Sequence, residues 1–157
     1  TAYLMLHMLK GTTEWFGEDH DRFGTAVGLG RYGLLTDGNE VGGKTGTTAN
    51  YSDGWFVGVT KDLVAGVWVG GEDRSIHFRT LALGQGGRMA MPIYGRFMEK
   101  VYKDEDLGIT KGPFKRPSRA LSVEIDCDRY KNPDYMESDS LQLNQDPQEN
   151  FNPGDIF

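Results

Sequence analysis

The run Gly-Gly-Lys-Thr-Gly-Thr-Thr at residues 42–48 brings together groups that can hold an anion. A lysine supplies a fixed positive charge, and three hydroxyls can donate hydrogen bonds. A glycine among them lets another backbone lie directly against the chain. The residues concerned are Lys44, Thr45, Gly46, Thr47 and Thr48. Because hydrogen bonds to an ionised group are stronger than bonds between neutral groups, the run predicts a site for a carboxylate or a phosphate.

Residues 38–45 also match the phosphate-loop pattern G-x-x-x-x-G-K-[ST]. In such a loop a helix follows, and its N-terminal amides face the phosphates. Here residues 46–54 are rich in glycine and in short polar residues that compete for backbone hydrogen bonds, which disfavours a helix. We therefore place Lys44 and Thr45 on a strand. A phosphate-loop nucleotide-binding module remains the alternative from another class.

Two runs rich in β-branched and aromatic residues follow, at 53–60 and 63–71, with Lys61 and Asp62 between them as a short polar turn. This pattern predicts a β-hairpin. Alternate positions of the second run are apolar on both faces, so we expect both faces of that strand to be buried.

One helix is expected on each side of these strands. Residues 2–10 predict the first, ending near Gly11. Pro92 suits the first turn of the second, over 92–102, and a glycine-rich loop at 81–87 precedes it. Two adjacent rows at i, i+4, i+8 spacing predict a single apolar face. The rows are Ile93, Phe97 and Val101, and Tyr94, Met98 and Tyr102.

Three motifs occur in order: Lys-Thr-Gly-Thr-Thr at 44–48, Asp-Gly-Trp-Phe-Val-Gly at 53–58 and Gly-Val-Trp-Val-Gly at 66–70. K-T-G alone is common by chance, but this ordered set is specific. Over roughly residues 1–102 the chain resembles the last third of a penicillin-binding protein transpeptidase domain, most closely the bifunctional, class A type. The resemblance implies an α/β (α+β) fold: a partial serine transpeptidase or β-lactamase-like domain, with an antiparallel sheet packed with helices.

Active sites of this class combine S-x-x-K, S-x-N and K-T-G. Only K-T-G is present, because no serine has lysine three positions later or asparagine two positions later. We therefore expect a C-terminal piece of a longer protein that is inactive by itself. The alternatives within the class are a serine β-lactamase or a β-lactam sensor. A further alternative, without catalysis, is an interaction module.

The resemblance implies that the parent protein is a peptidoglycan D,D-transpeptidase, with a glycosyltransferase domain upstream. Its partners would be a stem peptide ending in D-Ala-D-Ala and the β-lactam antibiotics that mimic it. Lys44, Thr45 and Thr47 would hold the substrate carboxylate, and the Thr47 backbone N–H would be an oxyanion donor. Gly46 would admit the substrate backbone, with Thr48 completing the binding strand.

Composition narrows the remaining classes. The net charge of -6 and the lack of a basic stripe argue against nucleic acid as a partner. The three histidines and Cys127 lack metal-ligand spacing, and the G-x-G-x-x-G match at 28–33 lacks a following helical pattern, so we expect no metal and no cofactor. No apolar run approaches 18 residues. In the family, an N-terminal region anchors the protein in the membrane. The resemblance therefore implies that this chain lies in the cell envelope, on the extracytoplasmic side of the inner membrane.

Three regions are expected along the chain. Residues 1–104 form the C-terminal portion of the transpeptidase domain. Residues 105–130 form a docked extension with one strand, because 120–127 alternate between apolar and polar residues. Residues 131–157 combine prolines with many acidic and amide side chains, the composition of a disordered acidic tail.

Overall fold

The structure of the chain is a computed structural model that describes residues 1–16, 22–121 and 123–125. The chain divides into two units, Thr1–Arg116 and Pro117–Phe157. All helices and strands of the described residues belong to the first unit, which also holds the residues predicted to bind substrate.

The first helix, α1, spans Ala2–Lys10 as predicted, and a 3-10 turn, η1, continues it over Gly11–Thr13. It lies against strand β3, Gly42–Thr47. The approach is close, because a Cβ on Gly42 would come within 3.0 Å of the Leu9 Cβ. Glycine at this position therefore lets the helix and the strand pack together.

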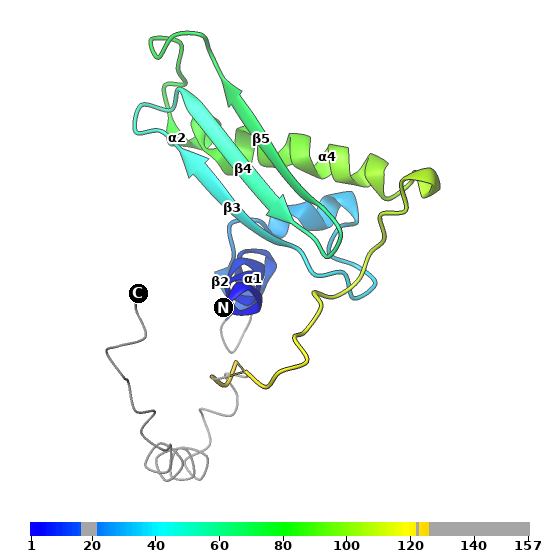
Figure 1. Ribbon diagram of the computed structural model, residues 1–157. Helices are drawn as coiled ribbons and strands as arrows, with labels where there is room; N and C mark the ends of the chain where they lie inside the picture. The colour runs from blue at the N-terminus through cyan, green and yellow to red at the C-terminus, as the bar shows by residue number, and fades with distance from the viewer. Residues whose placement is uncertain (17–21, 122, 126–157) are drawn as a thin grey trace, which may run out of the picture. The chain divides into compact units, whose positions relative to one another are not determined.

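Three strands form an antiparallel sheet in the order β3-β4-β5, where β4 is Asp53–Val59 and β5 is Val64–Gly70 (Figure 1). The predicted strand through K-T-G and the predicted hairpin are thus confirmed. Lys44 lies within β3, opposite Val57 of β4. Because the lysine is on a paired strand and not on a loop that opens a helix, the phosphate-loop alternative is excluded.

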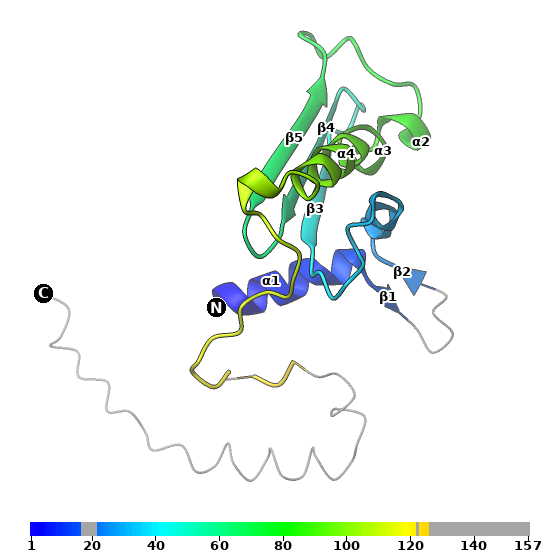
Figure 2. The ribbon, with the colours of Figure 1, turned by 90° about the vertical axis from the view of Figure 1, so that its right-hand side faces the viewer.

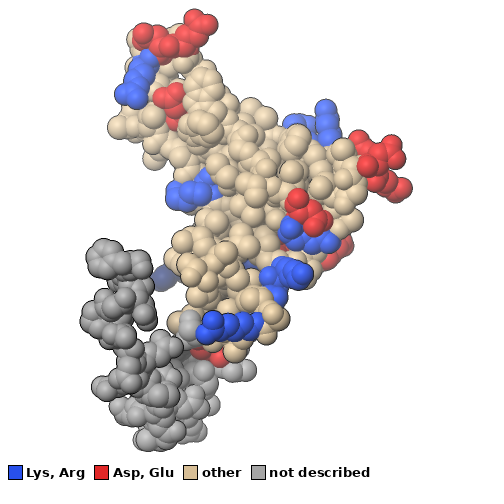
Figure 3. Space-filling model, viewed as in Figure 1, with Lys and Arg blue, Asp and Glu red and all other residues tan. Residues whose placement is uncertain are grey.

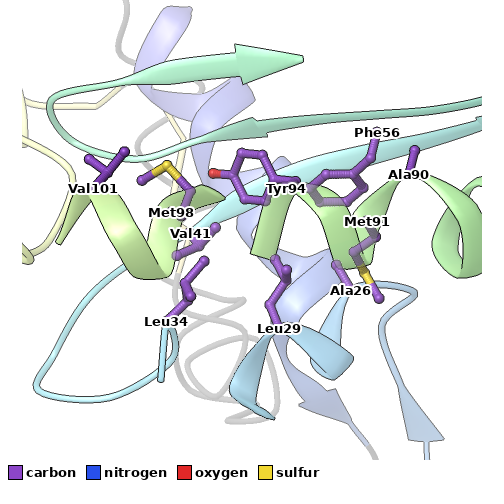
Figure 4. Close-up of a cluster of buried hydrophobic side chains, with 10 residues drawn as sticks. All are labelled: Ala26, Leu29, Leu34, Val41, Phe56, Ala90, Met91, Tyr94, Met98 and Val101. Atoms are coloured by element: carbon purple, nitrogen blue, oxygen red, sulfur yellow. The ribbon is translucent and has the colours of Figure 1, made fainter. Parts of the chain in front are cut away.

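The second predicted helix is confirmed as α4, Met91–Val101, which covers one face of the sheet (Figures 1 and 2). The Tyr94 ring lies directly over Gly58, and a Cβ there would collide with it. Phe56 packs beside this ring, with 5.0 Å between centroids. The buried cluster consists of Ala26, Leu29, Leu34, Val41, Phe56, Ala90, Met91, Tyr94, Met98 and Val101 (Figure 4).

The apolar face of α4 is narrower than predicted. Tyr94, Met98 and Val101 are buried, whereas Ile93 and Phe97 remain 51% and 46% exposed. One residue turns a helix by about 100°, so the two predicted rows point in different directions. Within the described residues, neighbouring elements cover the row of Tyr94, Met98 and Tyr102, but of the other row they bury only Val101.

The prediction that both faces of β5 are buried is wrong for one face. Val64 and Trp68 are exposed, together with Trp55 and Val57 on the same face of β4. Figure 2 shows α2, α3 and α4 on one side of the sheet, and Figure 3 shows the other side as a mostly uncharged surface. Alternation in the sequence reports that a face is apolar, but it does not report which element covers that face.

The connection predicted as a glycine-rich loop forms two helical turns, α2 (Leu81–Gly84) and α3 (Gly86–Met89). The N–H of Gly84 donates to the Thr80 carbonyl at 3.0 Å, which closes the first turn. α3 packs against both β3 and β4. The segment therefore has a fixed geometry beside the K-T-G strand.

Before β3 the chain forms a pair of two-residue strands, β1 (Trp15–Phe16) and β2 (Arg22–Phe23). A 3-10 helix, η2, follows over Val27–Tyr32. Leu29 is fully buried and anchors η2 in the core. The G-x-G-x-x-G match thus lies mainly on a 3-10 helix and does not open a longer α-helix.

The first unit continues past the boundary that the sequence places at residue 104. After the 3-10 turn η3, Glu105–Leu107, the N–H of Gly112 donates to Asn39 Oδ1 at 3.0 Å. The N–H of Phe114 donates to Glu40 Oε2 at 2.8 Å, and the Phe114 ring is buried. These contacts hold the segment up to Arg116 against the loop that leads into β3.

In the second unit, the described residues 117–121 and 123–125 contain no strand. The predicted strand at 120–127 is therefore missing from the part of that stretch that the structure describes. A strand needs a hydrogen-bonded neighbour, and an alternating pattern alone does not supply one. The rest of the stretch, and the predicted tail at 131–157, lie outside the described residues.

Candidate functional site

The K-T-G strand, β3, is one of the two edge strands of the described sheet. The N–H of Thr48 donates to the carbonyl of Asp53 at 3.1 Å, so Thr48 faces β4 with its backbone groups. Successive residues of an antiparallel strand direct these groups to opposite sides. The backbone N–H and C=O of Thr45 and Thr47 therefore point to the free edge of β3, where no strand of the described residues pairs with them.

The side chains of the motif divide between the two faces of the sheet. Thr45 lies opposite Phe56, on the face that α3 and α4 cover. Lys44 lies opposite the exposed Val57, on the uncovered face. Its ammonium donates to the Thr45 carbonyl at 2.6 Å, so the positive charge bends to the free edge of the strand. The motif therefore offers hydroxyls on one side and a cation at the edge.

A cavity of about 540 Å³ opens beside the hydroxyls, between β3, η2 and α3. Its apolar part includes Phe23, Met91 and Pro92. Its polar side chains are those of Thr25, Arg31, Thr45, Thr47, Gln85 and Arg88. Two of them are cationic and none of the lining residues is acidic, so the cavity suits an anionic group.

The Thr47 hydroxyl has a fixed position. Its Oγ1 accepts a hydrogen bond from the N–H of Gly86 at 2.9 Å. Gly86 cannot carry a side chain, because a Cβ would collide with the carbonyls of Gly46 and Trp55. A hydroxyl that accepts from a backbone N–H keeps its own proton to donate. The Thr47 hydroxyl is therefore held in place and remains able to donate to a ligand.

No protein-family model matches the chain. Penicillin-binding protein 1A of Pseudomonas aeruginosa is 35% identical over 127 residues, which are 80% of this chain and 13% of that protein. Penicillin-binding protein 1A of Aquifex aeolicus is 39% identical over 88 residues, 54% of this chain and 11% of that protein. The crystal structure of penicillin-binding protein 1A from Haemophilus influenzae matches with a TM-score of 0.52 at 27% identity, over 78% of this chain and 16% of that one.

The chain belongs to the class A penicillin-binding protein family. The resemblance seen in the motifs is thereby confirmed, as is the mixed fold with an antiparallel sheet. The chain spans about an eighth of the length of the relatives named above.

In this penicillin-binding protein segment, Thr48 differs from the other two threonines of the motif. Its Oγ1 accepts from the N–H of Asp53 at 3.0 Å and lies 3.2 Å from the Ser52 hydroxyl. Its hydroxyl thus closes the turn between β3 and β4, and it does not line the cavity. The structure gives Thr48 the role of holding the motif strand in register.

Three polar residues of the cavity, Arg31, Gln85 and Arg88, lie outside the penicillin-binding protein motif that predicts the site. Arg31 lies inside the G-x-G-x-x-G match, which we set aside for lack of a helix. Arg88 comes more than forty residues after the lysine of K-T-G. Nothing in their spacing connects them to the motif. They reach one cavity only because η2 and α3 both pack beside β3.

Within the described part of the chain, no group of three histidine, cysteine, aspartate or glutamate side chains could hold a metal ion. No helix of residues 1–16, 22–121 and 123–125 is long and apolar enough to cross a membrane.

Proposed function

We propose that the chain forms the K-T-G wall of a serine D,D-transpeptidase site, which cross-links peptidoglycan stem peptides. One observation carries the proposal: the backbone N–H of Thr47 points to a free strand edge, next to the two threonine hydroxyls and the lysine ammonium. Acyl transfer needs a donor for the developing oxyanion and a grip on the neighbouring carboxylate. This edge offers both.

The reaction begins when a serine from outside this chain attacks the carbonyl of the penultimate D-Ala of a stem peptide. The carbonyl oxygen becomes an oxyanion, to which the Thr47 N–H donates. The C–N bond then breaks, and the terminal D-Ala leaves with a proton on its amine. An amine of a second stem peptide attacks the acyl-enzyme and releases the serine. Loss of one oxyanion donor costs about 10²–10³-fold in kcat.

The terminal D-Ala carries a carboxylate next to the reacting carbonyl, as β-lactams do. The hydroxyls of Thr45 and Thr47 donate to this carboxylate. Lys44 supplies positive potential at the strand edge, where it biases proton transfer to and from the serine. To bind substrate, Lys44 exchanges its present bond to the Thr45 carbonyl for contacts with the incoming groups.

The substrate lies along β3 as an added strand. The outward N–H and C=O groups of Thr45 and Thr47 can pair with an extended peptide. Gly46 has no side chain, so the peptide can lie flat against the strand. The same free edge would pair equally well with the peptide-like backbone of a β-lactam.

The nucleophilic serine and the S-x-N residues of this site come from parts of the parent protein outside the chain. In the bifunctional type, a glycosyltransferase domain precedes the transpeptidase domain. Peptidoglycan lies outside the inner membrane, so the site faces the extracytoplasmic side of the cell envelope. No cofactor enters the reaction as written.

The proposal is tested in the full-length protein with a fluorescent penicillin. Thr45→Val and Lys44→Ala should each reduce the acylation rate by at least about tenfold, since the first removes a hydroxyl that donates to the carboxylate and the second removes the positive potential that biases proton transfer. Thr36→Val and Lys103→Ala, at exposed sites outside the cavity, serve as matched controls and should label normally. Labelling of both site variants at the rate of the unchanged protein would refute the assigned roles.

A further inference from the structure

The positive charge on the hydroxyl side of the K-T-G strand does not come from the lysine of the motif. Lys44 sits on the opposite face of β3, and its ammonium is bonded at the strand edge. The cavity that contains the Thr45 and Thr47 hydroxyls instead contains two arginines, Arg31 and Arg88. A carboxylate bound there would meet these guanidinium groups.

Neither arginine is neutralised within the described residues. No ion pair or hydrogen bond joins the guanidinium group of Arg31 or Arg88 to a described residue, and no acidic side chain lines the cavity. The chain as a whole has a net charge of -6, so two unpaired cations facing one hollow are a local exception. A concave surface with one sign of charge attracts ligands of the other sign.

Both arginines stand on elements with fixed positions. Arg88 follows Gly86 by two residues on α3, and the Gly86 N–H is bonded to the Thr47 hydroxyl. Arg31 is on η2, whose Tyr32 ring packs so closely on Gly95 of α4 that a Cβ there would collide with it. The two guanidinium groups therefore start from backbone positions that packing contacts hold beside the hydroxyls.

We propose that Arg31 and Arg88 bind the carboxylate of the acyl donor together with the hydroxyls of Thr45 and Thr47. This assignment rests on the proposed function of the site. The planar guanidinium offers two parallel N–H donors that match a carboxylate, which an ammonium does not. Lys44 is then left to act at the strand edge, on the side of the reacting serine.

The test compares two probes on the full-length protein. One is an N-benzoyl-D-alanyl thioester of thioglycolic acid, which carries a free carboxylate at the position of the terminal D-Ala carboxylate. The other is the methyl ester of the same compound, which has no charge. In each case the serine attacks the thioester carbonyl and the thiol is released, so thiol release reports the acylation rate.

Arg31→Gln and Arg88→Gln should each lower the rate with the acid by about tenfold, as expected for the loss of one charge-assisted contact. The rate with the ester should change by less than about twofold, which also shows that the variants are folded. Lys44→Ala should lower both rates alike. Arg96→Gln, an exposed arginine of α4 outside the cavity, should leave both rates unchanged.

An equal loss on the acid and the ester, or no loss on the acid, would overturn the role of the arginines while leaving the transpeptidase proposal intact. If Lys44→Ala were the only variant to lose rate, and lost it only with the acid, Lys44 and not the arginines would bind the carboxylate. If the folded, unchanged protein reacted with neither probe nor with penicillin, the proposed function itself would fail, and this assignment with it.

Discussion

The ring of Tyr94 on α4 rests directly on Gly58 of β4, with no room for a Cβ between them. This contact sets the distance between the helix and the sheet. Because only Ala90 separates α3 from α4, the same contact helps to set where α3 meets the K-T-G strand.

Gly58→Ala should destabilise the protein by about 1–3 kcal/mol, since a methyl group would be forced into a packed core. The Tyr94 ring cannot tilt away freely, because Phe56 packs against it. Urea unfolding monitored by near-UV circular dichroism measures the change. Gly30→Ala is the control: its Cβ would have a nearest neighbour at 3.8 Å, so the change should stay within about 0.5 kcal/mol. Equal stability of the two variants would contradict the contact.

Tyr94→Phe should leave the stability unchanged or raise it by up to about 1 kcal/mol. The Tyr94 hydroxyl is buried and has no hydrogen-bond partner among the described residues. Burial also raises the pKa of this phenol far above its usual range, since a charged phenolate would be poorly solvated there. Tyr94→Ala should instead cost about 3–5 kcal/mol through the cavity it leaves. A loss above about 1 kcal/mol in Tyr94→Phe would mean that the hydroxyl is satisfied after all.

Glu40 should make the stability depend on acid pH. Partial burial alone would raise the pKa of this carboxyl, but hydrogen bonds from the Lys10 ammonium and the Phe114 N–H outweigh it and lower the pKa below 4.5. The folded state therefore binds its proton less readily than the unfolded state. The contribution of ionised Glu40 to the free energy of unfolding is present above pH 4.5 and is lost as the pH falls through the lowered pKa.

In Glu40→Gln the unfolding free energy should fall by about 1 kcal/mol at pH 7, and its decline as the pH falls below 4.5 should become shallower. Urea titrations at a series of pH values measure both effects. The matched control is Glu99→Gln, which removes a more exposed pair with Lys103 and should leave the unfolding free energy and its pH dependence nearly unchanged. An unaltered acid profile in Glu40→Gln would rule out this source of pH dependence.

Gly86→Ala should impair penicillin acylation by at least about tenfold, because the new methyl group would push α3 away from the carbonyls of Gly46 and Trp55. The Thr47 hydroxyl would then lose the N–H that holds it. The rate of labelling by a fluorescent penicillin measures the effect. Gly30→Ala is the control: Gly30 does not line the cavity and its Cβ would have a nearest neighbour at 3.8 Å, so this variant should label within about threefold of the unchanged protein. Normal labelling of Gly86→Ala would show that this contact does not position the hydroxyl.

The local patterns of the sequence were sufficient for the elements that carry the motif. β-branched and aromatic runs around Lys61 and Asp62 predicted the hairpin, and Pro92 with its apolar rows predicted α4. Glycine and threonine after Lys44 ruled against a helix, so the lysine was placed on a strand. These predictions succeed because turn chemistry and periodicity act over a few neighbouring residues.

Packing between distant segments was not predictable in the same way. Ile93 and Val64 are apolar in pattern yet exposed, because no described element covers the side they face. The segment up to Phe114 joins the first unit through bonds to Asn39 and Glu40, which are more than seventy residues away. Contacts of this kind depend on how elements meet in space, and a single sequence does not encode them in its spacing.

For the site, the amino-acid sequence by itself determined the strand, the motif and the family resemblance, because each depends on residue types at short spacing. Only the tertiary structure decided which groups share a face. The pleat of β3 separates Lys44 from Thr45 and Thr47, and the packing of η2 and α3 brings Arg31 and Arg88 to the hydroxyls. The geometry of a strand places successive side chains on opposite faces. The charged groups that lie beside the threonine hydroxyls, however, depend on which other elements pack against that face.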